Sequence, residues 1–314
     1  MVTRIPTLGM SREDWLEARR GSIGGSDAAT VLGLNPYSSP YALWAEKTGV
    51  VPAPDISDRE AVRLGNFLEP YVAQRFAEIT GKKVRRENYI LRNPEYPWAH
   101  ANVDRMVIGE KAGLECKTTS ALNLRKFKNG EYPANYYCQC VHYMAVTGAE
   151  KWYLAVLIGN QEIRIFEILR DEDEIRALMD AERRFWRHVE ERTPPETDGI
   201  SATGDTLEAQ YPEEDPEVTI DLTPVCGVLR VYLDTKAQIK ELERQLDGAA
   251  NAIKAYMGSA AAGTYEGSRV TWKTIRSRRF DRDAFERDHP GVDMRKYTKE
   301  TAGRRFEVKG ENTL

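Results

Sequence analysis

The chain has 314 residues, of which 41% are hydrophobic and 30% charged, a balance typical of globular proteins. No apolar run approaches the roughly 18 residues that a membrane span needs, and the first residues lack the apolar core of a signal peptide, so we expect a cytoplasmic protein. The formal net charge of −4 excludes a polycation, so any contact with nucleic acid must come from a local positive surface.

The first part of the chain alternates predicted helices and strands. Ser11 is placed to cap a helix over residues 11–18, and a glycine-rich turn follows it. A long helical period covers residues 59–80 and ends at Gly81. Strands are then predicted over residues 83–91, 101–108 and 113–119.

The alternation continues with a helix over residues 134–147 and a hairpin made of residues 151–158 and 162–169. Residues 171–192 predict another helix, with acidic residues at its start and basic residues at its end. We therefore expect an α/β (α+β) domain over residues 1–195.

The composition changes after this domain. Residues 193–217 hold eight acidic residues and no Lys or Arg, so we expect an acidic linker over residues 196–217 and a C-terminal accessory module over residues 218–314. Apolar residues spaced by four and three between positions 228 and 256 predict a long heptad helix. A β-hairpin is predicted to turn at Glu266–Gly267.

The end of the accessory module is basic and aromatic. Residues 269–309 contain thirteen Lys or Arg against seven Asp or Glu, a net charge of +6. The interleaved aromatic residues are Trp272, Phe280, Phe285, Tyr297 and Phe306. We expect these rings to form the core of a small domain; the alternative is a basic, aromatic surface that holds single-stranded DNA by stacking and phosphate contact.

Three charged residues are spaced for chemistry. Glu115 and Lys117 are two apart in a predicted strand, so they share one face, with Cys116 opposite. A turn near residues 109–113 would pair this strand with the previous one and bring Asp104 beside Glu115. Two carboxylates and a lysine suit a magnesium ion that activates water against a phosphodiester, with the Cys116 carbonyl as a further ligand. The alternative is a surface hairpin with an ordinary salt bridge.

Two other elements add to this interpretation. Glu69 lies at the edge of the apolar stripe of helix 59–80, where a charged side chain needs a metal or a basic partner unless it is simply solvated. Arg19 is suited to phosphate, and the glycines after it let backbone N–H groups approach an anion, with Ser26 as a further donor. An ordinary glycine-rich loop is the alternative for that segment.

The four cysteines do not form paired clusters, which favours free thiols over a zinc or iron–sulfur site. They are Cys116, Cys138, Cys140 and Cys226.

The order of these elements resembles the lambda-type phage exonucleases and YqaJ-like viral recombinases of the PD-(D/E)xK nuclease superfamily. The matching residues are Trp15, Arg19, Ser26, Gly65, Glu69, Asp104, Glu115, Lys117, Tyr137 and Gln139. The resemblance covers roughly residues 10–190. The sequence departs from the family signature at Val103, where the family has a proline.

The resemblance implies a restriction-endonuclease-like central mixed sheet flanked by helices, and a role for most of the matching residues. Asp104 and Glu115 would be metal-binding carboxylates, with Glu69 as the additional helix carboxylate. Lys117 would be the catalytic lysine. The remaining matches are Arg19 and Ser26 at the DNA 5′-phosphate, and Gln139 as the supporting glutamine.

The implied activity is a magnesium-dependent deoxyribonuclease, with Mn²⁺ able to replace Mg²⁺. Such an enzyme of a phage or prophage would digest double-stranded DNA from a free 5′ end during recombination in the host cell. It would leave a 3′ single strand for an annealing protein, and it would form a homotrimeric ring. Two alternatives stay open: an endonuclease or RecB-like nuclease of a helicase complex, and a non-catalytic DNA-binding or scaffold protein.

Overall fold

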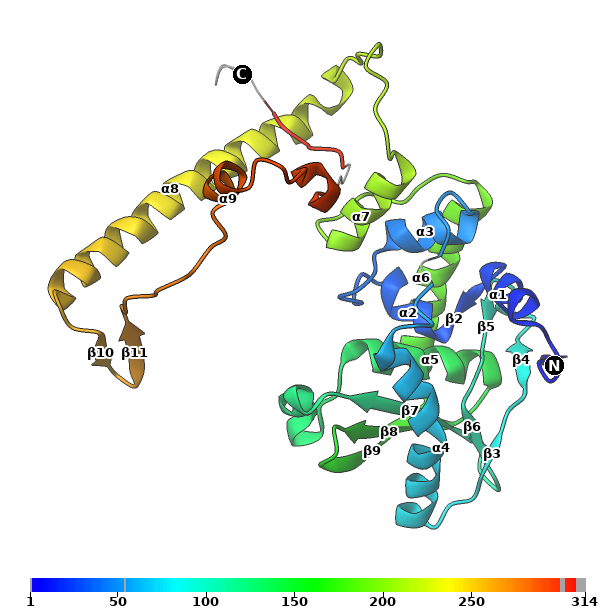
Figure 1. Cartoon of the computed structure of the whole chain (residues 1–314). Coiled ribbons are helices and arrows are strands. Elements are labelled where there is room, and N and C mark those ends of the chain that lie inside the picture. The colour runs from blue at the N-terminus through cyan, green and yellow to red at the C-terminus, as the bar shows by residue number, and fades with distance from the viewer. Residues whose placement is uncertain (1, 54, 300–302, 309–314) are drawn as a thin grey trace. The chain divides into compact units, whose positions relative to one another are not determined.

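The structure is a computed structural model that describes residues 2–53, 55–299 and 303–308. The chain divides into two compact units, unit 1 over Met1–Pro212 and unit 2 over Glu213–Leu314 (Figure 1). Within the described residues, no helix combines the length and the apolar character that crossing a membrane requires.

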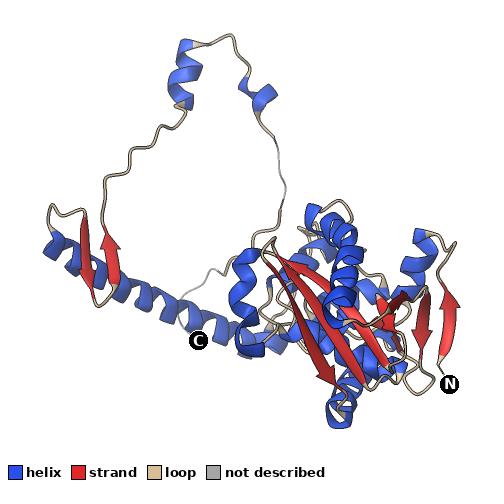
Figure 2. Cartoon of the chain, turned by 90° about the horizontal axis from the view of Figure 1, so that it is seen from below, coloured by secondary structure: helices blue, strands red, loops and turns tan. Residues whose placement is uncertain are grey.

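Unit 1 is built on a five-stranded sheet with helices on both of its sides (Figure 2). The strands run in the order β3 (Val84–Arg86), β6 (Arg105–Val107), β7 (Ala112–Thr119), β8 (Lys151–Ile158) and β9 (Glu162–Leu169). Strands β7 and β8 are parallel and the other neighbours are antiparallel, so the sheet is mixed, as the sequence predicts.

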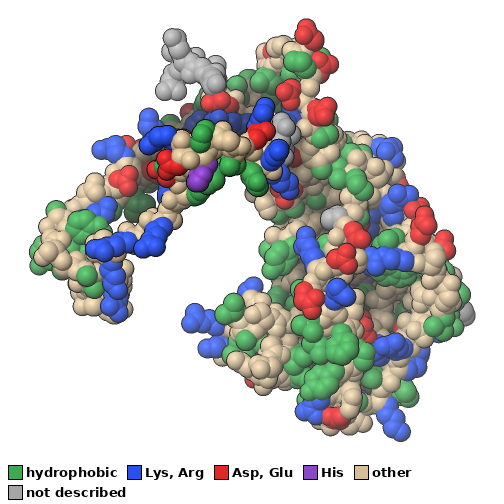
Figure 3. All heavy atoms as spheres, viewed as in Figure 1, with side chains coloured by type: hydrophobic (Ala, Val, Ile, Leu, Met, Phe, Trp, Pro, Cys, Tyr) green, Lys and Arg blue, Asp and Glu red, His purple; other side chains and the backbone are tan. Residues whose placement is uncertain are grey.

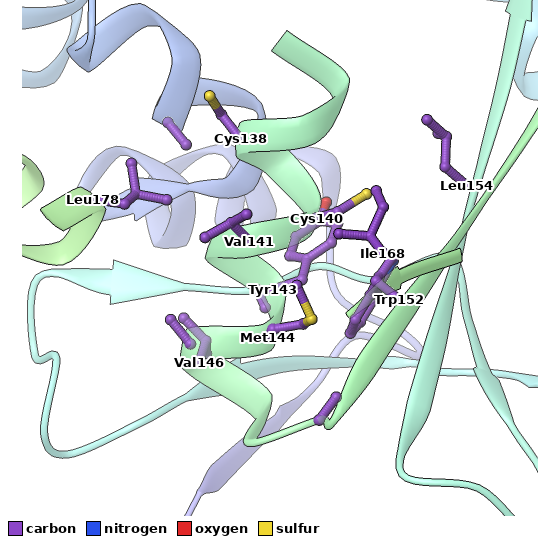
Figure 4. Packing of buried hydrophobic residues seen from close by; sticks show 14 of the residues in the cluster. Cys138, Cys140, Val141, Tyr143, Met144, Val146, Trp152, Leu154, Ile168 and Leu178 are labelled. Atoms are coloured by element: carbon purple, nitrogen blue, oxygen red, sulfur yellow. The ribbon is translucent and has the colours of Figure 1, made fainter. Parts of the chain in front are cut away.

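Strand β8 is buried on both faces. Trp152 and Leu154 pack in the cluster that contains α5 (Ala134–Thr147), and Figure 4 shows Trp152 beside Tyr143 and Met144 of that helix. Tyr153 and Ala155 pack instead in the cluster that contains α4 (Glu60–Thr80). Because successive side chains of a strand point to opposite faces, a nearly continuous apolar strand fits between the two helices.

Gly113 of β7 makes room for the largest of these side chains. A Cβ atom built on Gly113 would lie 2.2 Å from the Trp152 ring, which is wholly buried. Any other residue at position 113 would therefore displace the ring from the core beneath β7.

Further helices and short strands complete unit 1. Helix α6 (Glu172–Glu190) and helix α2 (Gly25–Val31) pack on α5, and α3 (Pro40–Thr48) packs on α2 and α6. The remaining elements are α1 (Arg12–Arg20), η1 (Ala121–Gly130), the pair β1 (Thr3–Pro6) with β4 (Tyr89–Arg92), and the pair β2 (Ile23–Gly24) with β5 (Ala99–His100).

The acidic linker predicted over residues 196–217 is wrong for its first part. Helix α7 (Ser201–Gln210) packs on α3, and the buried Thr203 donates from Oγ1 to Ser39 Oγ at 2.7 Å. Leu207 packs on the adjoining apolar cluster. Its two acidic side chains, Asp205 and Glu208, are exposed and its apolar residues are few, so composition alone suggested a linker.

Unit 2 contains η2 (Thr223–Val225), the long helix α8 (Cys226–Met257), the hairpin β10 (Ala262–Tyr265) and β11 (Ser268–Thr271), α9 (Arg282–Asp288) and η3 (Met294–Tyr297). The hairpin turns at Glu266 and Gly267, both with positive φ, as the sequence predicts.

The small aromatic core predicted for this unit is not formed by its described residues. None of them is buried, and Trp272, Phe280, Tyr297 and Phe306 are exposed, while Phe285 is half-buried. The predicted basic tail ends at Lys309, which lies outside the described residues. The rings therefore stay available on the surface of unit 2, which favours the alternative interpretation of the sequence.

Candidate active site

The pairing of β6 with β7 brings the two predicted metal carboxylates together. Arg105 is the register partner of Leu114, so the next position places Asp104 beside Glu115. Asp104 Oδ2 accepts a hydrogen bond from the Cys116 backbone N–H at 2.8 Å. The side chain of Asp104 is thus fixed just before β6, at the end of the strand pair opposite the β6–β7 turn.

Glu115 and Lys117 share the face of β7 that the strand period predicts. Lys117 Nζ lies 2.7 Å from Glu115 Oε1, and Glu115 is only 2% exposed. Burial alone would lower the pKa of Lys117, but the Glu115 carboxylate outweighs this effect and raises it. The lysine is therefore held as a cation against the carboxylate.

Helix α5 supplies a polar strut behind Glu115. Gln139 Nε2 donates both to Glu115 Oε1 and to Tyr143 Oη, each at 2.8 Å. Tyr143 Oη in turn donates to the Asn102 carbonyl at 2.8 Å, two residues before Asp104. Tyr143 was not foreseen, although its spacing of four from Gln139 on a predicted helix places both side chains on one face.

Glu69 has the basic partner that its position predicts, rather than a contact with the other carboxylates. Arg105 Nη1 lies 2.5 Å from Glu69 Oε1 and also donates to the Asp104 carbonyl at 2.7 Å. Arg105 was missed because Glu69, its partner, lies 36 residues away in the sequence. In the described part of the chain, no three His, Cys, Asp or Glu side chains are arranged to hold a metal ion.

The remaining pair of carboxylates nevertheless fits a cation. Glu115 Oε2 is buried and has no hydrogen-bond partner among the described residues. Burial and the neighbouring Glu115 carboxylate raise the pKa of Asp104 well above its ordinary value. A divalent ion with hard oxygen preference would satisfy the orphaned oxygen and relieve the repulsion between the two carboxylates.

The two predicted phosphate-contacting residues also lie together. Arg19 Nη2 is 3.2 Å from Ser26 Oγ, and the Arg19 guanidinium lies over the Trp15 ring, 4.4 Å from its centroid. A cleft of about 250 Å³ is lined by Trp15, Glu69, Asp104 and Arg105 among others. Residues from α1, α4 and the segment that leads into β6 thus border one cleft.

An ion pair beside Arg19 was not predicted. Lys47 Nζ lies 2.8 Å from Asp27 Oδ2 and donates to the Arg19 carbonyl at 3.1 Å. Burial alone would raise the pKa of Asp27, but the Lys47 ammonium and the Gly24 N–H outweigh it and lower the pKa to about 2. No local signal pairs these residues, because they come from separate helices and meet only in the fold.

Helix α2 connects the Arg19 region to the carboxylates. A Cβ atom on Gly25 would lie 2.5 Å from the Tyr143 ring, so only glycine lets the start of α2 approach α5 this closely. Tyr143 therefore contacts both the start of α2, next to Ser26, and Gln139, which holds Glu115.

Comparison with known proteins gives two kinds of match. The family described as "YqaJ-like viral recombinase domain" matches residues 14–150. "Uncharacterized protein YqaJ" of Bacillus subtilis (strain 168) is 44% identical over 304 residues, which cover 96% of this chain and 95% of that protein. Protein D345L of African swine fever virus (strain Badajoz 1971 Vero-adapted) is 56% identical over 36 residues, 12% of this chain and 10% of that protein.

Among solved structures, an alkaline exonuclease (LHK-Exo) from Laribacter hongkongensis matches with a TM-score of 0.49 and 20% identity, over 62% of this chain and 97% of that chain. A phage-related exonuclease from Haemophilus somnus 129PT matches with a TM-score of 0.41 and 12% identity, over 57% of this chain and 99% of that chain.

Proposed function

The chain belongs to the family of YqaJ-like viral recombinase domain proteins, and we propose that it is a metal-dependent nuclease that acts on DNA. One observation carries the proposal: Asp104 and Glu115 lie side by side, and Lys117 is paired with Glu115 on the same strand face. Two carboxylates and a cation, with Asp104 at the border of a cleft, suit phosphodiester hydrolysis.

Asp104, Glu115 and the Cys116 carbonyl are the groups that would hold Mg²⁺, with Mn²⁺ as a substitute. Glu69 would join them only by exchanging its Arg105 partner for the metal. When bound, the ion would supply an activated water and neutralise charge developing on the phosphoryl group. Gln139 holds Glu115 Oε1 from behind, so the carboxylate keeps its direction while Oε2 stays available.

Lys117 supplies a positive hydrogen-bond donor at the same place. Its ammonium is anchored by Glu115 Oε1 and lies 5.4 Å from the centroid of the Tyr136 ring. From there it would orient the attacking water and stabilise negative charge on a non-bridging phosphate oxygen. Arg105 keeps the segment that carries Asp104 in place through the Asp104 carbonyl.

The finer proposal is a 5′-to-3′ exonuclease of double-stranded DNA that leaves a 3′ single strand in phage or prophage recombination. Arg19 and Ser26 would bind the terminal 5′-phosphate, which carries more charge than an internal one and rewards a guanidinium. A single-strand annealing protein would be the partner. A homotrimeric ring would supply three positive channel faces, which suits a chain whose own charge is −4.

The test uses linear duplex DNA labelled separately at each 5′ and 3′ end, and a covalently closed circle as its control. With Mg²⁺, we expect early release of the 5′ label, progressive loss of one strand, an intact circle and no reaction in EDTA. Cleavage of the circle would instead indicate an endonuclease. An absence of any Mg²⁺- or Mn²⁺-dependent cleavage would overturn the nuclease proposal and favour a scaffold.

A further inference from the structure

Unit 2 carries a continuous positive segment, here called the basic strip, over residues 269–280. It contains no acidic residue and five basic residues, which are Arg269, Lys273, Arg276, Arg278 and Arg279. Every residue of the strip is exposed, and after Thr271 the chain has no regular secondary structure until α9 begins. Figure 3 shows the Lys and Arg side chains gathered over β11 and the segment that follows it.

The charges of the strip are not neutralised within the described chain. None of its five cationic side chains has an ion-pair or hydrogen-bond partner there, whereas nearby arginines are paired, as Arg282 is with Glu286 and Arg295 with Asp293. Unpaired cations that lie within a few residues of each other repel one another, so the strip is suited to an anionic ligand with regularly repeated charge.

Large apolar side chains stand between these cations. Trp272 is 48% exposed, Ile275 is 89% exposed and Phe280 is 68% exposed. The Phe280 ring has a neighbour in Phe285, with ring centroids 5.2 Å apart, but it is not covered. A tryptophan and a phenylalanine left open in a basic segment offer flat surfaces on which unpaired bases stack.

We propose that the basic strip is a binding site for single-stranded DNA. Arg276, Arg278 and Arg279 contact successive phosphates, while Trp272 and Phe280 stack on bases. A duplex fits the strip less well, because its base faces are already stacked inside the helix. The proposal rests on the proposed function for the source of the ligand, because a nuclease that removes one strand leaves the other single.

The experiment measures binding of a fluorescein-labelled oligo(dT) by anisotropy, with the full chain in EDTA. The variant Arg276→Ala/Arg278→Ala/Arg279→Ala is compared with a matched control, Lys236→Ala/Lys240→Ala/Lys254→Ala, which removes the same three charges from α8 of the same unit. We expect the strip variant to lose on the order of tenfold or more in affinity. The slope of log K against log salt should become shallower by about 2, since each lost contact with single-stranded DNA contributes about 0.7. The control should change little.

Stacking is tested separately with Trp272→Ala and Trp272→Phe. We expect Trp272→Ala to weaken binding on the order of tenfold without changing the salt slope, and Trp272→Phe to recover most of the affinity. All of these side chains are exposed, so circular dichroism and the unfolding midpoint should match those of the wild type.

Three results would overturn the proposal: wild-type affinity in the strip variant, an equal loss in the control, or a larger loss of affinity for a blunt duplex than for oligo(dT) in the strip variant. Wild-type affinity for oligo(dT) in the strip variant is also the result expected if the strip binds an acidic protein instead of DNA. Cleavage of end-labelled duplex with Mg²⁺ is measured on the same variants. If the wild type shows no nuclease activity but the strip variant still loses oligo(dT) binding, the proposed function is wrong and the proposed binding site remains supported.

Discussion

Lys117 lies between two groups that favour its charged form, the Glu115 carboxylate and the face of the Tyr136 ring. A neutral side chain at this position would leave the carboxylates in place and remove only the donor. We therefore expect Lys117→Ala to slow single-turnover cleavage of linear duplex by roughly 100- to 1000-fold, the scale for losing one key electrostatic donor. Mn²⁺ affinity should persist.

The control for this variant is Lys83→Ala, which removes an equal charge from an exposed position just before β3. It should cleave at the wild-type rate. A near-normal rate for Lys117→Ala would remove Lys117 from the chemistry and leave it as a partner that neutralises Glu115.

Arg19 holds its guanidinium between the Trp15 ring and Ser26 Oγ, so its direction is set before any ligand arrives. We expect Arg19→Ala to erase the preference for 5′-phosphorylated over 5′-hydroxyl ends while metal affinity stays unchanged. Arg19→Lys should recover only part of the preference, because an ammonium lacks the bidentate geometry. If the wild type digests both kinds of end equally well, the role of Arg19 in reading the end is wrong.

At the scale of elements, the Asp27–Lys47 pair joins α2 to α3. The folded pKa of Asp27 is about 2, below the ordinary 3.8, so the ionised carboxylate stabilises the fold above pH 4. This stabilisation disappears as the pH falls from about 4 towards 2. A shift of this size corresponds to about 2 kcal/mol.

The expected result is that Asp27→Asn lowers the free energy of unfolding by about 2 kcal/mol at pH 7 and by about half as much at pH 3. Urea denaturation of wild type and variant at both pH values measures the difference. A difference that is the same at both pH values would mean that packing, and not the charge of Asp27, joins the two helices.

The sequence predicted best where the signal is local. The apolar period of residues 134–147 and the hairpin of 151–158 with 162–169 match α5, β8 and β9, because alternation and turn chemistry act over a few residues. The approach of Asp104 to Glu115 was also predictable, since a short turn fixes the register. Arg105 and Lys47 were missed because their partners lie far away in the sequence. Tyr143 differs, because its spacing of four from Gln139 is a local signal.

The error in the linker has the same physical origin. Residues 201–210 are short and rich in small and acidic side chains, so their helical period is weak. They become a helix because Thr203 and Leu207 have somewhere to pack on unit 1. Tertiary contacts, and not intrinsic propensity, decide the structure of such a segment.

At the scale of the whole molecule, the division into units gives a prediction about truncation. The candidate site lies wholly within unit 1, so a chain that ends at residue 212 should keep Mg²⁺-dependent cleavage and lose DNA affinity, processivity or partner binding.

A chain that ends at residue 195 lacks α7, which uncovers the side chains that it packs against on α3, including Ser39 and Tyr41. It should melt at a lower temperature. A folded chain of residues 1–212 without cleavage under any condition would show that unit 2 belongs to the catalytic fold.

The central claim is that Asp104 and Glu115 hold the metal of a nuclease, and the single-turnover cleavage rate of Glu115→Gln at saturating Mg²⁺ tests it most directly. Glutamine keeps the size of the side chain and removes the charge, while Glu110→Gln does the same at the β6–β7 turn, at the other end of the two strands. We expect Glu115→Gln to lose roughly 1000-fold or more in rate with an almost unchanged melting temperature, and Glu110→Gln to cleave normally. Cleavage by Glu115→Gln at a rate close to that of the wild type would contradict the account.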